Sequence, residues 1–213
     1  MKKRFLGVYD YTVILTYISL LSGVLGIIFA TWGSAYHHAA VFCVLFSGLC
    51  DAFDGAVART KKNRTDDERN FGIQLDSLCD VISFGIVPAL VCYFMGVDGV
   101  IGIAIVFFYV LCALIRLAFF NVIEAKRQKV ESGSSKYYRG LPVTTICMIL
   151  PPTYLLNFVL PKNVFEIVLH VMLVVVGFLF IFDFKVRKTR FDKIFSRKGK
   201  KKAKNIKKDE INV

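Results

Sequence analysis

Residues 51–59 read DAFDGAVAR, and they place two carboxylates at the end of an otherwise apolar run. Asp51 and Asp54 are three residues apart, so a helix presents both on one face. The next apolar run opens with the stretch GIQLDSLCD, in which Asp76 and Asp80 are four residues apart and again share a helix face. A short polar connection joins the two runs, so we predict a helical hairpin that brings the two acidic pairs together.

The apolar runs on both sides of this hairpin are long enough to cross a membrane. Of the 213 residues, 55% are hydrophobic, and the mean hydropathy is +0.56, which exceeds the apolar share of an ordinary soluble domain. A membrane-spanning helix needs about 20 mostly apolar residues. We therefore predict an all-α polytopic membrane protein with six transmembrane helices, at residues 12–31, 39–58, 75–96, 99–121, 141–160 and 164–184.

The positive charge lies at the ends of these runs. The formal net charge is +12, and Arg116 and Lys162 are the only lysines or arginines outside the N-terminal segment, the second and fourth connections, and residues 185–213. By the positive-inside rule these segments face the cytoplasm, which places both termini inside. The charge therefore indicates topology rather than nucleic-acid binding. Residues 1–184 are expected to form a transmembrane domain in the cell membrane, and residues 185–213 a disordered basic cytoplasmic tail that contacts anionic lipid headgroups.

Ionisable side chains within membrane spans are costly, so the four aspartates are candidate functional residues. Carboxylates that face one another in a medium of low dielectric repel strongly, and divalent cations such as Mg²⁺ or Mn²⁺ neutralise them. Two such ions bridged by shared carboxylates form a clamp for displacement at phosphorus. Gly55, Ala58 and Gly72 lack bulk beside the acids and leave room for a large ligand. We predict a site for two divalent cations held by Asp51, Asp54, Asp76 and Asp80.

Two other interpretations of the acids stay open at this point. They can cap helices or pair with lysines of the connecting segments, which is the common role of a single acidic residue. They can also serve a small cation transporter, which would place its carboxylates near the middle of the bilayer. Here both pairs lie at the same end of their spans, near the predicted cytoplasmic leaflet.

The spacing D-x2-D-G-x2-A-R, followed by G-x3-D-x3-D, resembles the defining motif of the CDP-alcohol phosphotransferases. The resemblance implies an integral membrane enzyme with six helices, usually a homodimer, that transfers a phosphatidyl-type group from a CDP-activated donor to an alcohol and releases CMP. It assigns Asp80 as the catalytic general base, and it assigns the CMP portion of the donor to Gly55, Ala58, Arg59 and Gly72. The connection from Thr60 to Phe71 is longer than the family usually has.

Segments outside this motif indicate the acceptor. Residues 75–89, LDSLCDVISFGIVPA, resemble the phosphatidylserine synthases of the family, as do RLAFFN at 116–121 and RGLP at 139–142. The resemblance implies CDP-diacylglycerol as donor and L-serine as acceptor; glycerol phosphate, inositol phosphate and choline are the alternatives. Arg116 is expected level with the acids and Arg139 at a helix N-terminus, where each guanidinium can bind the acceptor or a lipid phosphate. Interfacial placement of Arg139 and a structural ion pair of Arg116 are the alternatives.

Overall fold

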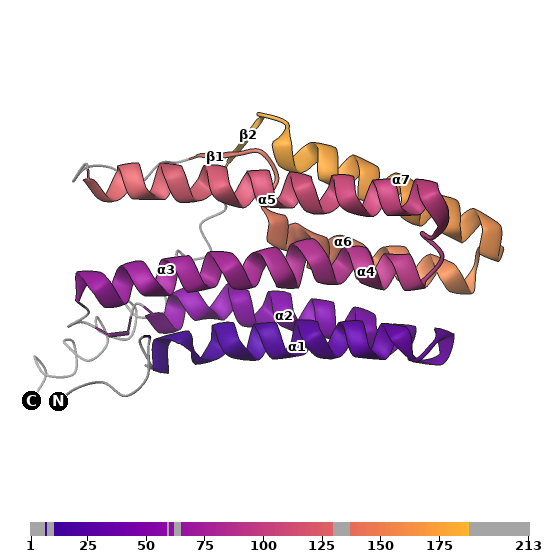
Figure 1. The fold of residues 1–213 in the computed structure, drawn as a ribbon, viewed down its shortest axis with the longest axis horizontal. Helices are drawn as coiled ribbons and strands as arrows, with labels where there is room; N and C mark the ends of the chain where they lie inside the picture. The colour runs from indigo at the N-terminus through magenta and orange to yellow at the C-terminus, as the bar shows by residue number, and fades with distance from the viewer. Residues whose placement is uncertain (1–6, 8–10, 59, 62–64, 130–136, 188–213) are drawn as a thin grey trace, which may run out of the picture.

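The computed structural model describes residues 7, 11–58, 60–61, 65–129 and 137–187. The described chain is mainly helical, with one small antiparallel sheet (Figure 1). In chain order the elements are α1 (Ile14–Thr31), α2 (His37–Ala58), α3 (Asp66–Asp80), a π-helix (Val81–Ile86), α4 (Val87–Phe94), α5 (Gly99–Lys129), β1 (Tyr137–Arg139), α6 (Ile146–Leu155), α7 (Lys162–Ile181) and β2 (Lys185–Arg187). Short 3₁₀ turns at Tyr11–Val13, Ser34–Tyr36, Val143–Thr145 and Leu156–Phe158 flank α1, α2 and α6.

Five helical segments of the described chain are long and apolar enough to cross a membrane. They are Tyr11–Thr31, Ser34–Val57, Asp67–Phe94, Gly99–Ile123 and Lys162–Ile181. The sixth predicted span, 141–160, is instead a shorter apolar helical segment, Val143–Phe158. Its α-helical part contains Pro151 and Pro152, which lack the N–H that a regular helix needs. Six crossings are therefore not established by helix length.

The helices form two groups with α6 between them (Figure 1). In one group α1 packs along α2, and the continuous α3–α4 helix lies against both. In the other group α5 packs along α7. Helix α6 contacts α2 on one side and α7 on the other. Buried residues from both groups form one core, which includes Val87 and Val91 of α4, Tyr109 of α5 and Phe180 of α7.

Small polar side chains bring α1 and α2 close together. The hydroxyl oxygens of Ser19 and Ser47 lie 2.6 Å apart, and Ser47 also donates to the Ser19 carbonyl at 2.9 Å. One turn further along α1, Ser22 donates to the Cys43 carbonyl at 2.8 Å. Helices in membranes associate through such small residues and interhelical hydrogen bonds, because apolar burial alone gains little in lipid.

Helix α3 begins well before the apolar run that predicted it. Thr65 accepts a hydrogen bond from the Glu68 amide at 3.2 Å, and the Glu68 carboxylate accepts one from the Thr65 amide at 3.2 Å. This reciprocal capping box satisfies donors that a helix start leaves unpaired. The helix therefore starts at Asp66, in a polar segment where hydropathy predicts no span.

The small sheet joins two segments that are far apart in the sequence. Strand β1 pairs antiparallel with β2, with Arg139 opposite Lys185. The Gly140 amide continues the connection by donating to the Phe184 carbonyl at 2.7 Å. The sequence patterns predicted no strand, and they assigned residues 185–187 to the tail. Residues 188–213 of that tail lie outside the described part of the chain.

Candidate metal centre and adjoining cavity

Three aspartates from two helices converge beside the α2–α3 connection. Asp51 of α2 and Asp76 and Asp80 of α3 each offer a carboxylate oxygen, and these atoms lie within 4.8 Å of one another. Asp54, one turn after Asp51 on α2, is not one of this group of three. All four side chains are half-buried. The antiparallel hairpin therefore brings the two acidic pairs face to face, as their spacing predicted.

No positive side chain neutralises this cluster within the described residues. The ion pairs found there are Lys61 with Glu68 at 3.0 Å and Lys162 with Glu166 at 3.8 Å. One oxygen of Asp76 is buried and has no hydrogen-bond partner in the same part of the chain. A half-buried set of oxygen ligands without a cationic partner suits a hard divalent ion. These contacts give no support to the interpretation in which the acids pair with lysines of the connection.

The small residues of the motif lie on either side of the same connection. Gly55 is half-buried in α2, and Gly72 is half-buried in α3. Ala58 is the last residue of α2, and its side chain is outside the described part. Arg59 follows it and lies outside the described residues, so its predicted role in nucleotide binding stays a prediction.

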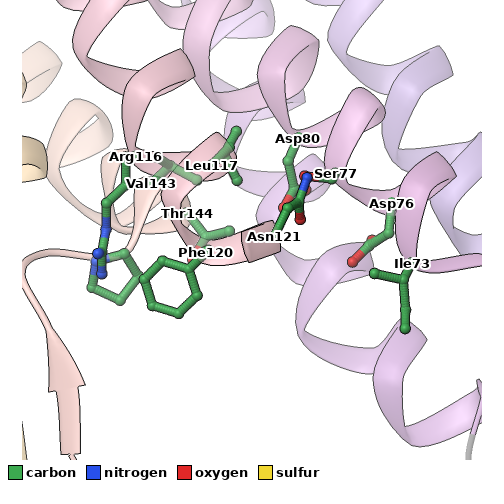
Figure 2. A pocket seen from close by; sticks show the side chains of 11 residues that line it. Ile73, Asp76, Ser77, Asp80, Arg116, Leu117, Phe120, Asn121, Val143 and Thr144 are labelled. Carbon is green, nitrogen blue, oxygen red and sulfur yellow. The ribbon is translucent and has the colours of Figure 1, made fainter. Parts of the chain in front are cut away.

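A cavity of about 470 Å³ adjoins the acidic cluster (Figure 2). Asp76, Ser77 and Asp80 line one wall, and residues of α5 and of the segment that leads into α6 line the other. Ser77 and Asn121 connect the two walls, with the Asn121 amide nitrogen donating to the Ser77 hydroxyl at 2.8 Å. The sequence did not predict this pair. The signal for it was that Ser77 and Asn121 lie in the stretches LDSLCD and RLAFFN, beside functional candidates.

Arg116 lies at the edge of this cavity, away from the acids (Figure 2). It is buried, with 5% of its surface exposed. Its Nε donates to the Leu141 carbonyl at 3.1 Å and its Nη2 to the Gly140 carbonyl at 3.3 Å. The guanidinium carbon also lies 4.0 Å from the centre of the Phe120 ring, a cation–π contact. Arg116 therefore holds the turn before α6, and its described hydrogen bonds go to backbone carbonyls rather than to an acid.

The second candidate arginine, Arg139, is in β1, directly before this turn. Its side chain lies outside the described part of the structure, so its contacts are not defined. Gly140 next to it has φ +69°, and a Cβ there would lie 2.9 Å from the Phe182 carbonyl oxygen. The turn that Arg116 binds therefore requires glycine.

Comparison with known protein families accounts for the arrangement of acids. The model of the CDP-alcohol phosphatidyltransferase family matches residues 12–182, which include all four aspartates and the cavity. The chain belongs to this family. CDP-alcohol phosphatidyltransferases are typically dependent on divalent metals, and the cluster of Asp51, Asp76 and Asp80 can hold such an ion.

Curated relatives within the CDP-alcohol phosphatidyltransferase family include enzymes that act on serine. The chain is 37% identical over 148 residues to the CDP-diacylglycerol–serine O-phosphatidyltransferase of Saccharomyces cerevisiae, covering 65% of this chain and 52% of the relative. It is 36% identical over 146 residues to the archaetidylserine synthase of Methanothermobacter thermautotrophicus, covering 68% of this chain and 58% of the relative. It is 32% identical over 155 residues to the CDP-diacylglycerol–serine O-phosphatidyltransferase of Helicobacter pylori, covering 68% of this chain and 60% of the relative. The chain thus spans between about half and three fifths of the length of these relatives.

Proposed function

We propose that this protein transfers a phosphatidyl group from CDP-diacylglycerol to L-serine and releases CMP. The observation that supports it most is the cluster of family-motif aspartates, free of cationic partners in the described chain, beside a cavity large enough for a small acceptor. The names of the relatives support serine as the acceptor.

The residues of the chain divide between holding the donor and moving a proton. Asp51, Asp54, Asp76 and Asp80 would hold two divalent cations, Mg²⁺ or Mn²⁺. These ions would neutralise the donor pyrophosphate and stabilise the leaving CMP. Gly55, Ala58, Arg59 and Gly72 would surround the CMP portion, because small residues let a nucleotide approach the helix backbone.

Asp80 is the proposed general base. It lines the cavity and can accept the proton of the serine hydroxyl as the oxygen attacks the lipid-side phosphorus. The new O–P bond forms as the bond from that phosphorus to the CMP oxygen breaks, and CMP departs with that bonding pair. Arg116 and Arg139 are proposed to bind the carboxylate of the acceptor or a lipid phosphate. Arg116 would use the guanidinium N–H groups that do not donate to the Leu141 and Gly140 carbonyls.

The membrane arrangement that we propose has six crossings, both termini in the cytoplasm and the site at the inner leaflet. The hydroxyl groups of Tyr11 and Thr60 lie 3.2 Å apart, so the start of the first helix and the α2–α3 connection share one end of the bundle. Pro142, just beyond β1, lines the same cavity as Asp76. These contacts support a common side for the basic segments. We further propose a homodimer, with residues 1–184 as the catalytic domain and residues 185–213 as a cytoplasmic tail.

The proposal is tested with purified protein in lipid nanodiscs, CDP-diacylglycerol and radiolabelled acceptors. Asp76→Asn and Asp80→Asn are both expected to lower metal-dependent CMP release; for Asp80, the proposed general base, the loss should be at least about 100-fold. Glu166→Gln is the matched control, since Glu166 pairs with Lys162 on α7 and should keep full activity. Undiminished turnover in both aspartate variants would refute the mechanism. Labelled glycerol phosphate, inositol phosphate or choline entering lipid in place of serine would refute only the acceptor.

A further inference from the structure

The helix that contains Asp76 and Asp80 changes its winding directly after Asp80. Asp80 is the last residue of α3, and the π-helix Val81–Ile86 follows, with the Val87 amide donating to the Ile82 carbonyl five residues earlier. A π turn contains more residues than an α turn, so it rotates all later side chains relative to the earlier ones. The π-helix therefore decides how Asp80 is oriented relative to the packing of α4.

The packing of α4 depends on this rotation. Val87 lies against the glycine face of α1, where a Cβ on Gly23 or Gly26 would be 3.1 and 3.6 Å from its methyl groups. A carboxylate oxygen of Asp80 meanwhile lies within 4.8 Å of one of Asp51, on α2. In an uninterrupted α-helix, residues seven apart lie on nearly the same face. Without the π turn, Asp80 and Val87 would point to the same side of the helix. Asp80 could then not face α2 while Val87 faces α1.

The Phe84 carbonyl of the π-helix accepts a hydrogen bond from a neighbouring helix. The hydroxyl of Tyr109, in α5, donates to it at 2.8 Å. Both Tyr109 and Phe84 are completely buried. The tyrosine thus gives this carbonyl a donor in a place where an unpaired carbonyl is costly. In α winding the same carbonyl would face residue 88, which is Pro88 and has no N–H.

The same face of α5 continues from this bond to the cavity. Ala113, one turn after Tyr109, lies 3.4 Å from where a Cβ on Gly85 would be, so α5 and the π-helix are in close contact. Leu117, a further turn along, lines the cavity next to Asp80. The hydrogen bond of Tyr109 therefore fixes both the π-helix after Asp80 and the helix that forms the opposite wall.

We infer that Tyr109 is a positioning residue for the acidic site: its hydroxyl holds the π-helix in the winding that directs Asp80 toward Asp51. The inference rests on the proposed function in that these aspartates bind the divalent ion. Tyr109 itself touches neither the acids nor the cavity among the described contacts, so it acts through the backbone between residues 81 and 87.

The test begins with Tyr109→Phe, which removes one oxygen atom. In metal-free protein, hydrogen exchange of the amides in segment 81–89 should accelerate. Mn²⁺ affinity, measured by electron paramagnetic resonance in phosphatidylcholine nanodiscs, should fall roughly tenfold, the scale of one lost buried hydrogen bond. The matched control is Ser83→Ala in the same π-helix. The Ser83 hydroxyl is buried without a hydrogen-bond partner in the described chain, so its removal should change neither measurement.

Two further variants show whether the effect passes through Asp80. In an Asp80→Asn background, Tyr109→Phe should weaken Mn²⁺ binding no further, whereas in an Asp54→Asn background its effect should persist in full. Pro88→Ala, with Tyr109 kept, gives residue 88 an amide that α winding would direct to the Phe84 carbonyl, in competition with the Tyr109 hydroxyl. It should therefore speed exchange and weaken Mn²⁺ binding, and it also decides the question if Tyr109→Phe fails to fold.

Several results would overturn the inference. They are unchanged exchange or Mn²⁺ affinity in Tyr109→Phe, an equal loss in the Asp80→Asn background, and unchanged Mn²⁺ affinity in Pro88→Ala. If Asp80→Asn binds Mn²⁺ more weakly than the wild-type protein while Tyr109→Phe behaves as wild type, only the role of Tyr109 is refuted. If wild-type protein binds no Mn²⁺ and releases no CMP, the proposed function fails as well.

Discussion

Gly48→Ala tests the close approach of α2 and α6 beside the acidic site. Gly48 precedes Asp51 by one turn of α2 and faces Cys147 of α6. A Cβ at position 48 would overlap the Cys147 sulfur and lie 2.7 Å from the Cys147 Cβ. Rotation of the cysteine side chain can move the sulfur, but the Cβ is fixed to the α6 backbone. The two helices must therefore separate by several tenths of an ångström at least.

The expected cost follows from overpacking at a helix contact. Inserting a methyl group into a packed interface destabilises by about 1–3 kcal/mol, which for a chain of this length lowers Tm by roughly 3–10 °C. Thermal unfolding in detergent, followed by circular dichroism, measures this loss. Because Thr144, at the start of the same segment, lines the cavity, the KM for the acceptor should rise as well.

A compensating substitution and a milder glycine variant serve as controls. Cys147→Gly removes the opposing side chain, so in the double variant Gly48→Ala should cost much less than it does alone. Gly177→Ala is the graded comparison: its nearest atom would be the Phe108 ring edge at 3.2 Å, which can yield, so the loss should be smaller. Wild-type stability of Gly48→Ala, or equal costs in the presence and absence of Cys147, would refute the contact.

Two further substitutions test the packing at other points. Ser19→Ala should destabilise by about 1 kcal/mol, because it removes the hydroxyl bonded to Ser47; the double alanine variant should cost less than the two single changes added, and strict additivity in thermal unfolding would contradict this. Gly140→Ala should lower stability by about 1–3 kcal/mol or more, because φ is +69° and the Phe182 carbonyl is in the way. Gly99→Ala has the same φ with no atom within 4 Å, so an equal loss in both variants would show that the clash contributes nothing.

The regular helices were largely predictable from the sequence because hydropathy acts locally. Runs at 12–31, 99–121 and 164–184 predicted helices that the structure has at Tyr11–Thr31, Gly99–Ile123 and Lys162–Ile181. The helix around 141–160 was found but is shorter than predicted. Hydropathy averages over the window and does not register that prolines interrupt backbone hydrogen bonding.

The spacing of the aspartates also predicted their convergence, because periodicity places residues three or four apart on one helix face. That the described residues give the acids no cationic partner was not predictable. Which acid a lysine of the connection pairs with depends on side-chain directions, and the structure pairs Lys61 with Glu68.

The sequence by itself therefore determined the helical membrane fold, the family and the acidic hairpin, since each depends on residues close together in the chain. Only the tertiary structure decided the contacts across long separations. Arg116 binds the carbonyls of residues 140 and 141, Ser77 binds Asn121, and β1 pairs with β2. The π-helix belongs to the same group. Its Phe84 carbonyl accepts a hydrogen bond from a hydroxyl that α5 supplies from 25 residues away, and no local pattern of residues 81–86 records that donor.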